Sequence, residues 1–221
     1  MRQTLVFSKF QSPELNHLYS HYFTSVAGKV KITTPYTGTI QETIVPVPQV
    51  FHRFDVESPT QEATDRFKYF KTKILPNLQI SALLTTSTLI FIPSYFDFVR
   101  LRNYLKEEQA SFCKLSEYSS NQDISRSRFE FFHGNVSFML YTERFHFFKR
   151  YNIRGIKNIV FYGLPMHNHF YSELINMIED SQESSVMVMY CKYDKMRLER
   201  ITGSKNAQLM IQGEKDSFMF T

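Results

Sequence analysis

The chain has 221 residues with 26 basic and 21 acidic side chains, which gives a formal net charge of +5 at neutral pH. A hydrophobic fraction of 43% and a charged fraction of 21% are typical of a globular chain and exclude an intrinsically disordered one. The length suits one well-packed domain with an appendage and is short for two domains. The basic balance favours polyanionic partners only weakly, because many basic proteins bind no nucleic acid.

Two isolated cysteines, Cys113 and Cys191, favour a reducing compartment over a disulfide framework and argue against a cysteine-based zinc site. No apolar run approaches the ~18 residues of a membrane span. The start of the chain also lacks the apolar core of a signal peptide. We therefore expect a cytosolic or nuclear protein that does not bind a membrane.

The first quarter of the chain is predicted to be a strand, a helix and an extended segment. Residues 2–8, RQTLVFS, have the composition of a buried strand, so we expect a fragment or one domain of a larger protein. Ser12 before Pro13 is a helix start, with a capping hydroxyl and a proline at the first helical position. Residues 29–54 are expected to be extended, because the spaced prolines of IVPVPQV suit edge strands or loops.

Helices and short apolar strands alternate after this segment. Ser58 and Pro59 repeat the capping signal, and the helix they begin is expected to stop at Pro76. The further predicted strands cover residues 88–93, 136–142, 158–165, 185–191 and 207–213. The further predicted helices cover residues 94–108, 123–134 and 167–180. This alternation predicts an α/β fold with a mostly parallel sheet, whose ligands gather at the carboxyl ends of the strands.

Familiar catalytic motifs are missing from the sequence. It contains no G-x-x-x-x-G-K-[ST] loop to hold phosphates, no G-x-G-x-x-G fingerprint and no G-x-S-x-G elbow. His167 and His169 form an H-x-H pair, which we interpret as a polar loop because no carboxylate or thiol lies at ligand spacing. We therefore expect no catalytic residue, no metal and no cofactor.

Three clusters combine basic and aromatic residues just after predicted strand ends. Arginine and lysine contact phosphates, and exposed rings stack on bases. For any single residue, a core ring beside a solvated charge is the simpler interpretation, but the three positions together favour binding. The clusters are Arg100 and Arg102; Arg126 and Arg128 with Phe129, Phe131 and Phe132; and Arg144, Lys149, Arg150 and Arg154 with Phe145, His146, Phe147, Phe148 and Tyr151.

Several segments resemble DEAD-box RNA helicases. RQTLVFSKF resembles the strand that carries motif III, and TLIFIPSYFDFVRLRNYL resembles motif IV with its following helix. The stretch from LYTERFHFFKRY to IRGIKNIVFYGLP resembles motif V, with Thr142-Glu143 in place of Thr-Asp and Arg154-Gly155 as the Arg-Gly. Motif VI should supply two arginines that contact ATP phosphates, but MHNHFYSELINMIED contains none.

The runs FIPSYFDFVRLRNY, LYTERFHFFKRY, IRGIKNIVFYGLP and FYSELINM resemble the C-terminal half of the digestive organ expansion factor family. The resemblance covers nearly the whole chain and implies a pseudo-helicase with two RecA-like lobes that have lost their ATPase motifs. Residues 1–45 would then be the end of the first lobe and a linker. Residues 46–221 would form the second, helicase C-terminal-like lobe, with helices on both faces of its sheet.

The same resemblance implies a non-catalytic RNA-binding and scaffold component of the nucleolar small-subunit processome, needed for ribosome biogenesis. Its partners would be the small-subunit ribosomal RNA precursor, small nucleolar RNA and other processome proteins, with no small-molecule substrate. A pure protein-interaction module of the same particle and an active ATP-dependent RNA helicase stay open as alternatives. The residues expected to contact RNA are Ser94, Arg100, Thr142, Arg144, Arg154 and Gly155.

The motif V-like stretch YTERFHFFKRYNIRG carries bulky rings where helicases have small residues. We expect a packed segment in which Phe145 and Phe148, three positions apart, share the inward face of a helix. Arg144, Lys149 and Arg150 should remain available on its outside.

Overall fold

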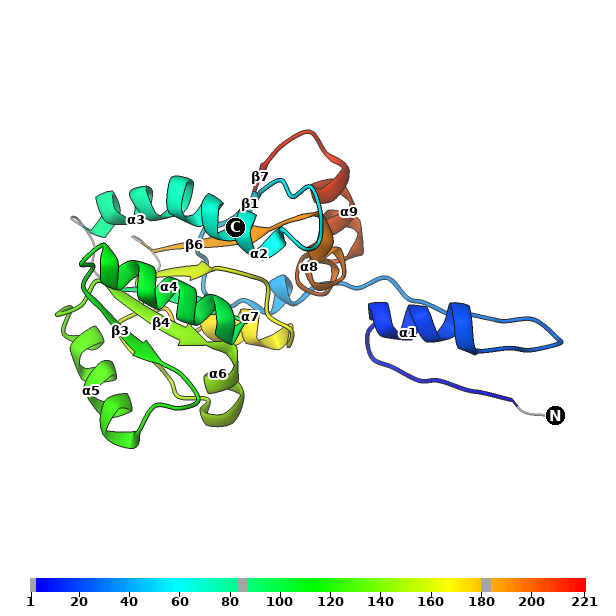
Figure 1. The fold of residues 1–221 in the computed structure, drawn as a ribbon, viewed down its shortest axis with the longest axis horizontal. Coiled ribbons are helices and arrows are strands. Elements are labelled where there is room, and N and C mark those ends of the chain that lie inside the picture. Colours follow the sequence, from blue (N-terminus) through cyan, green and yellow to red (C-terminus); the bar gives the residue numbers. More distant parts are fainter. Residues whose placement is uncertain (1–2, 83–86, 180–183) are drawn as a thin grey trace.

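The computed structural model of the protein describes residues 3–82, 87–179 and 184–221. Its described strands form one seven-stranded sheet in the order β3-β4-β2-β5-β6-β1-β7 (Figure 1). All neighbouring strands in it are parallel except β7, which runs antiparallel to β1 at one edge. The strands are β1 Gln49–Arg53, β2 Thr88–Ile92, β3 Phe112–Leu115, β4 Phe138–Thr142, β5 Asn158–Phe161, β6 Ser185–Tyr190 and β7 Ser217–Phe220.

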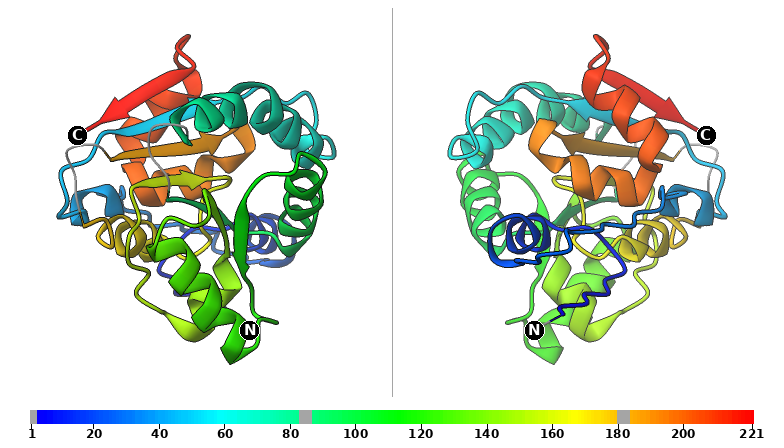
Figure 2. Two further views of the ribbon diagram at one scale, coloured as in Figure 1. Left: turned by 90° about the vertical axis from the view of Figure 1, so that its left-hand side faces the viewer. Right: turned by 90° about the vertical axis from the view of Figure 1, so that its right-hand side faces the viewer.

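Helices cover both faces of the sheet, as expected from the alternating sequence pattern (Figure 2). The described α-helices are α1 Pro13–His17, α2 Glu62–Tyr69, α3 Leu75–Ala82, α4 Tyr95–Glu107, α5 Asn121–Phe132, α6 Glu143–Lys149, α7 His169–Ile175, α8 Lys195–Thr202 and α9 Ser204–Gln212. In the described ranges, every helix is too short or too polar to span a bilayer.

Alternate residues of the central strands enter two separate hydrophobic cores. In β2, Leu89 and Phe91 face a core shared with helices α5 to α9. Their neighbours Ile90 and Ile92 face the second core, which is closed by α2 to α4. Burial of all five β2 residues explains why TLIFIP is continuously apolar, as parallel strands covered on both faces usually are.

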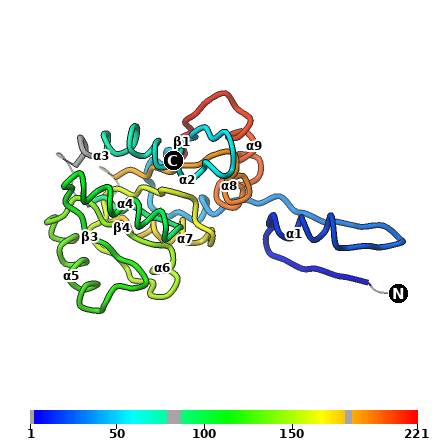
Figure 3. The backbone as a smooth tube through the Cα atoms, in the orientation of Figure 1, coloured from blue at the N-terminus to red at the C-terminus, as the bar shows by residue number. Residues whose placement is uncertain are grey.

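An N-terminal arm, residues 3–37, projects from the body of the molecule (Figures 1 and 3). The expected helix forms in this arm, because the Ser12 hydroxyl accepts the Leu15 N–H and Pro13 occupies the first helical position. The expected buried strand over residues 2–8 is wrong for its described part, since residues 3–8 are exposed and form no strand. An apolar segment becomes a strand only where another strand supplies hydrogen-bond partners, and within the described chain this one has no such neighbour.

Two further predictions are wrong near the chain's prolines and its end. The helix expected to stop at Pro76 continues into α3, after a π-helical turn over Phe70–Ile74. A wider turn ahead of a proline relieves the clash of its ring with the preceding carbonyls. Residues 207–213 were expected to be a strand, but residues 207–212 lie in α9, where Ala207 and Met210 are buried at helical spacing.

Two short edge strands escape sequence analysis. β3 has four residues, and its central residues Cys113 and Lys114 give no clear alternation. β7 likewise has four residues and an exposed Met219. Short edge strands depend on a neighbour rather than on their own pattern, so both were missed.

Candidate nucleic-acid interface

The carboxyl ends of four neighbouring strands lie level at one edge of the sheet. Ile92 pairs with Thr142, Leu115 with Tyr141 and Phe91 with Phe161, so the chain leaves β2, β3, β4 and β5 at similar height. The loops and helix starts that follow these strands therefore form one continuous surface, as parallel sheets predict.

The two hydroxyls expected to contact RNA, those of Ser94 and Thr142, both cap helices. The Ser94 Oγ accepts the Asp97 N–H at 3.4 Å, which begins α4. The Thr142 Oγ1 accepts the Phe145 N–H at 3.2 Å and donates to Glu117 Oε2 at 3.1 Å. Thr142 is buried, so its side chain serves the start of α6 rather than the surface.

Glu143, the motif V-like acid, holds the loop that follows β5. Its buried carboxylate accepts the Met166 N–H at 3.0 and 3.1 Å and the His167 N–H at 3.1 Å. The His167 Nδ1 also lies 3.0 Å from Glu143 Oε1. The sequence places no carboxylate at ligand spacing from the H-x-H pair, but the fold brings Glu143 to it. These hydrogen bonds of Glu143, called the Glu143 bracket below, connect α6 to the loop after β5.

Consecutive hydrogen bonds between the side chains of Tyr141, His146 and Glu173 join β4, α6 and α7. His146 Nε2 lies 3.0 Å from Glu173 Oε2, and because a carboxylate only accepts, this nitrogen donates. The Nδ1 atom of the neutral ring then accepts the Tyr141 O–H at 2.9 Å. Burial lowers the pKa of His146, although Glu173 acts against this shift, and burial raises the pKa of Tyr141. The neutral ring is therefore the form that this site favours.

The expectation for α6 is half right. Phe145 is fully buried, as predicted, but Phe148 is 62% exposed and the prediction for it is wrong. His146 takes the second inward position, because Tyr141 and Glu173 satisfy both of its ring nitrogens. Lys149 is exposed on the outer side, as expected.

The six residues expected to contact RNA are not all brought together. Residues 154–155 precede β5, whose entry hydrogen-bonds to Ser87 at the start of β2, so they lie at the amino edge of the sheet. There a Cβ on Gly155 would lie 3.3 Å from the backbone of Phe132. Arg100 is turned toward α2, donating to the Ala63 carbonyl at 3.0 Å. Ser94, Thr142 and Arg144 are at the carboxyl edge.

At the carboxyl edge of the sheet, the acidic side chains are more deeply buried than the basic ones. The acids Glu117, Glu143 and Glu173 are engaged by protein partners, and the Glu117 and Glu143 side chains are almost fully covered. Arg144 lies on the outside and its Nε is 3.5 Å from Glu117 Oε1, a charge contact without an aligned hydrogen bond. Arg150 is also largely outside, with Nη2 3.1 Å from His169 Nε2. The edge therefore presents cations to solvent.

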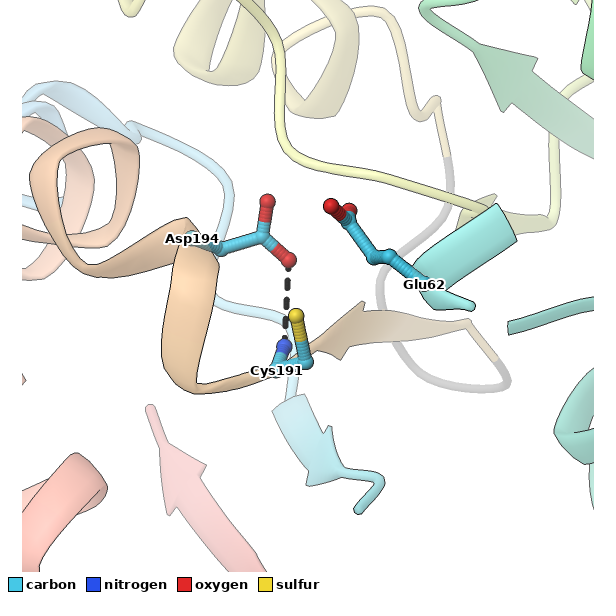
Figure 4. A group of neighbouring side chains, drawn as sticks. All are labelled: Glu62, Cys191 and Asp194. Atoms are coloured by element: carbon cyan, nitrogen blue, oxygen red, sulfur yellow. Dashed lines mark hydrogen bonds between the residues drawn. The ribbon is translucent and has the colours of Figure 1, made fainter. Parts of the chain in front are cut away.

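A potential set of metal ligands, Glu62, Cys191 and Asp194, lies beyond the end of β6 (Figure 4). The buried guanidinium of Arg66 already pairs with both carboxylates and lies 2.9 Å from Asp194 Oδ2. Burial would lower the pKa of Arg66, but the carboxylates outweigh it and raise the pKa above its ordinary value. Because a permanent cation already neutralises these acids, we interpret the cluster as a structural ion-pair network rather than a metal centre.

A groove of about 830 Å³ lies at the end of β1, four strands away from β4. Arg53 in its lining donates to the carbonyls of Met210, Ile211 and Gly213 at the end of α9. Because the Arg53 guanidinium is hydrogen-bonded to the end of α9, the groove offers less free positive charge than the α6 edge.

The architecture is that of a RecA-like helicase C-terminal lobe. The C-terminal domain of the DEAD-box protein Dbp5 aligns with a TM-score of 0.55, 17% identity, and coverage of 72% of this chain and 83% of that one. The DEAD-box protein SrmB from E. coli aligns with a TM-score of 0.50 and 12% identity, covering 68% of this chain and 81% of that one. At these identities the likeness defines the fold alone.

The family is defined by sequence. A family model described as "Utp25, C-terminal domain" matches residues 39–220, and the chain belongs to this family, which confirms the resemblance found in its motifs. Protein NUCLEOLAR FACTOR 1 of Arabidopsis thaliana is 43% identical over 220 residues, covering 99% of this chain and 29% of that protein. The human U3 small nucleolar RNA-associated protein 25 homolog is 41% identical over 225 residues, covering 99% and 30%. The chain thus spans about 30% of the length of these relatives.

Proposed function

We propose that this chain is a non-catalytic RNA-binding and scaffold domain of the nucleolar particle that processes the small-subunit ribosomal RNA precursor. Relatives more than 40% identical over almost the whole chain are named for association with U3 small nucleolar RNA, which supports a role in ribosome biogenesis. The particle's proteins and its precursor and small nucleolar RNAs are the proposed partners. Residues 1–45 are proposed to be the end of a preceding lobe and its linker.

The proposal of RNA binding is supported mainly by the arrangement of charges at the carboxyl edge, where basic side chains are exposed and acidic side chains are bonded to protein groups. Arg144, Lys149 and Arg150 face outward, while the acids beneath them are bonded to protein groups. A polyanion approaching α6 would meet cations without first meeting free carboxylates. Arg154 occupies the opposite edge, so its proposed RNA contact must be tested separately.

The test is the salt dependence of binding to a single-stranded RNA. Lys149→Gln should reduce the slope of log affinity against log salt by about 0.7, the value for one phosphate contact on a single strand. Arg144→Gln is best combined with Glu117→Gln, because this pair of changes leaves no unpaired carboxylate behind and keeps the net charge. Lys106→Gln, on the exposed end of α4, is the matched control. Unchanged slopes in both test variants would disprove the RNA assignment of α6.

A pure protein-interaction module is the second candidate, and the N-terminal arm favours it. Phe7, Val26, Val30 and Ile32 are almost fully exposed there, which is unusual for a free surface. If the arm and body bind only proteins, association should depend weakly on salt, whereas phosphate contacts make the dependence steep.

The non-catalytic assignment rests on motif chemistry. Phosphoryl transfer depends on positioning and electrostatic clamping of phosphates, and loss of an arginine-finger contact costs roughly 10³- to 10⁵-fold in rate. The segment expected to carry motif VI contains no arginine. An ATPase assay on the full-length protein tests this proposal, and robust RNA-stimulated turnover would support the active-helicase alternative instead.

A further inference from the structure

Exposed aromatic rings lie beside the outward cations of the carboxyl edge. Phe148 on α6 is 62% exposed, and the Arg144 guanidinium lies 6.0 Å from its ring centroid. Phe147 packs edge-on against Phe148 at 5.2 Å and contacts the His167 ring at 5.2 Å. Two neighbouring phenylalanines on one short helix thus keep much of their area in water.

A third ring extends this surface toward β3. Tyr118 follows the end of β3 and is 70% exposed. Its position is fixed on one side by Tyr95, whose ring lies 5.3 Å away in a T-shaped contact. On the other side, the adjacent Glu117 bonds to Thr142 and pairs with Arg144, which places Tyr118 next to the start of α6.

We propose that Tyr118, Phe147 and Phe148 form a stacking platform for the bases of single-stranded RNA, with Arg144 and Lys149 holding the phosphates. This inference rests on the proposed RNA-binding function and specifies how that function is carried out. Rings stack on the faces of unpaired bases with little sequence preference, and duplex RNA offers no such faces along its length. The platform therefore selects single-stranded over double-stranded RNA.

Charge decides between RNA and a protein as the occupant. Protein-binding interfaces are enriched in aromatic residues and arginine but depleted in lysine, so Lys149 rather than Arg144 distinguishes the two occupants. Here the neighbouring acids Glu117 and Glu143 are turned inward and engaged, while Arg144 and Lys149 point outward. Exposed rings beside exposed cations fit a ligand that combines flat apolar faces with regularly spaced negative charge.

The absence of tryptophan from the sequence makes stacking directly observable. Phe148→Trp and Tyr118→Trp each introduce a single fluorescent reporter. A short oligoadenylate should quench the emission of either variant by stacking, whereas an abasic ribose-phosphate strand of equal length should bind without quenching. Tyr22→Trp in the N-terminal arm, at a similarly exposed ring, is the control and should show no quenching.

Alanine variants give the energetic test. Stacking contributes roughly 1–3 kcal/mol per base, so Phe148→Ala and Tyr118→Ala should each weaken oligoadenylate binding by about 5- to 150-fold. Their affinity for the abasic strand should not change, and Tyr22→Ala should match the unmodified chain for both strands. Thermal melting confirms that the variants remain folded.

The outcomes separate the platform from the proposed function. If the chain binds both strands in a salt-dependent way but no quenching occurs and alanine variants keep their affinity, RNA binding stands and the platform is disproved. If neither strand binds at low salt, both proposals fail. If the ring variants lose association with another processome protein while keeping RNA affinity, the rings form a protein contact and the platform is again overturned.

Discussion

The carboxylate of Glu143 holds the backbone N–H of Met166, with both carboxylate oxygens within 3.1 Å of that nitrogen. These hydrogen bonds, the Glu143 bracket, join the first residue of α6 to the loop after β5. The bracket includes the N–H and the ring Nδ1 of His167. An acid that the motif resemblance associates with helicase chemistry is thus committed to holding the edge of the sheet together.

Glu143→Ala should lower the free energy of unfolding by about 2–4 kcal/mol, because it leaves several backbone and ring donors without their buried acceptor. Urea denaturation measures this change. Glu107→Ala, at an exposed position on α4, should stay within about 0.5 kcal/mol of the unmodified chain. Equal effects of the two variants would contradict the structural role of the bracket.

Arg66 and Asp194 form a buried ion pair, so removing one partner should cost more than removing both. Arg66→Met or Asp194→Asn alone should destabilise the protein by about 3–5 kcal/mol, because each leaves an uncompensated buried group. Combined, they should cost clearly less than the sum of the single changes. Denaturant titration of all four proteins measures the coupling, and strict additivity would show that the two side chains act independently.

Alanine substitutions at Gly38 and Gly28 allow a matched test of whether the contact between Gly38 and Gly203 holds the N-terminal arm on the body of the protein. Both have positive φ, at 91° and 94°, so alanine is strained at either position. Only at Gly38 would the added Cβ collide, lying 2.5 Å from both Gly203 N and the Ile201 carbonyl, whereas Gly28 has open space. Gly38→Ala should therefore destabilise the protein by at least about 1 kcal/mol more than Gly28→Ala.

The prediction for Gly38 is checked by limited proteolysis as well as by melting. If Gly38→Ala lifts the arm off α8, cleavage near residues 30–37 should become faster while the sheet stays protected. The same cleavage rate in the two alanine variants would mean that the crossing with Gly203 does not seat the arm.

Acidification should destabilise the protein partly through His146. Its folded-state pKa is lowered by burial, so the unfolded chain binds more protons as pH falls. The stability from the neutral ring is therefore fully present above the unfolded pKa of about 6.5 and is lost as pH falls toward the folded pKa. His146→Gln should show a smaller loss of unfolding free energy between about pH 7.5 and pH 5.5 than the unmodified chain.

Two further histidine variants serve as controls for the predicted pH dependence. His21→Gln removes a ring from the exposed arm and tests whether any histidine change has the same effect. His169→Gln removes a second ring whose pKa is lowered chiefly by burial, and the Arg150 beside it adds to that shift. An unchanged pH slope in His146→Gln would show that folding does not lower the pKa of this ring.

The sequence was informative wherever strand and helix follow directly on each other. Ser94 and Thr142 were located correctly at the carboxyl edge, because an apolar run ending in a hydroxyl residue predicts both the strand end and the helix cap. Arg154 was grouped with Thr142 because the two are close in sequence, but α6 and the loop after it carry the chain back to the amino edge. Distance along the chain cannot reveal that return.

The inward face of α6 was also beyond sequence analysis. Spacing favoured Phe148 over His146, because a phenylalanine costs nothing to bury and a histidine needs partners for both nitrogens. Those partners, Tyr141 and Glu173, come from two other elements and become visible only in the fold. The same tertiary dependence explains the missed strands β3 and β7.

The sheet order β6-β1-β7 has a consequence for how this protein is made. β1 is the first described strand to leave the ribosome, yet both of its neighbours are the last two. Until residues 185–220 have been synthesised, the hydrogen-bonding edges of β1 have no native partner. β1 therefore stays unpaired in the nascent chain until β6 and β7 have left the ribosome, and this open strand edge favours chaperone binding.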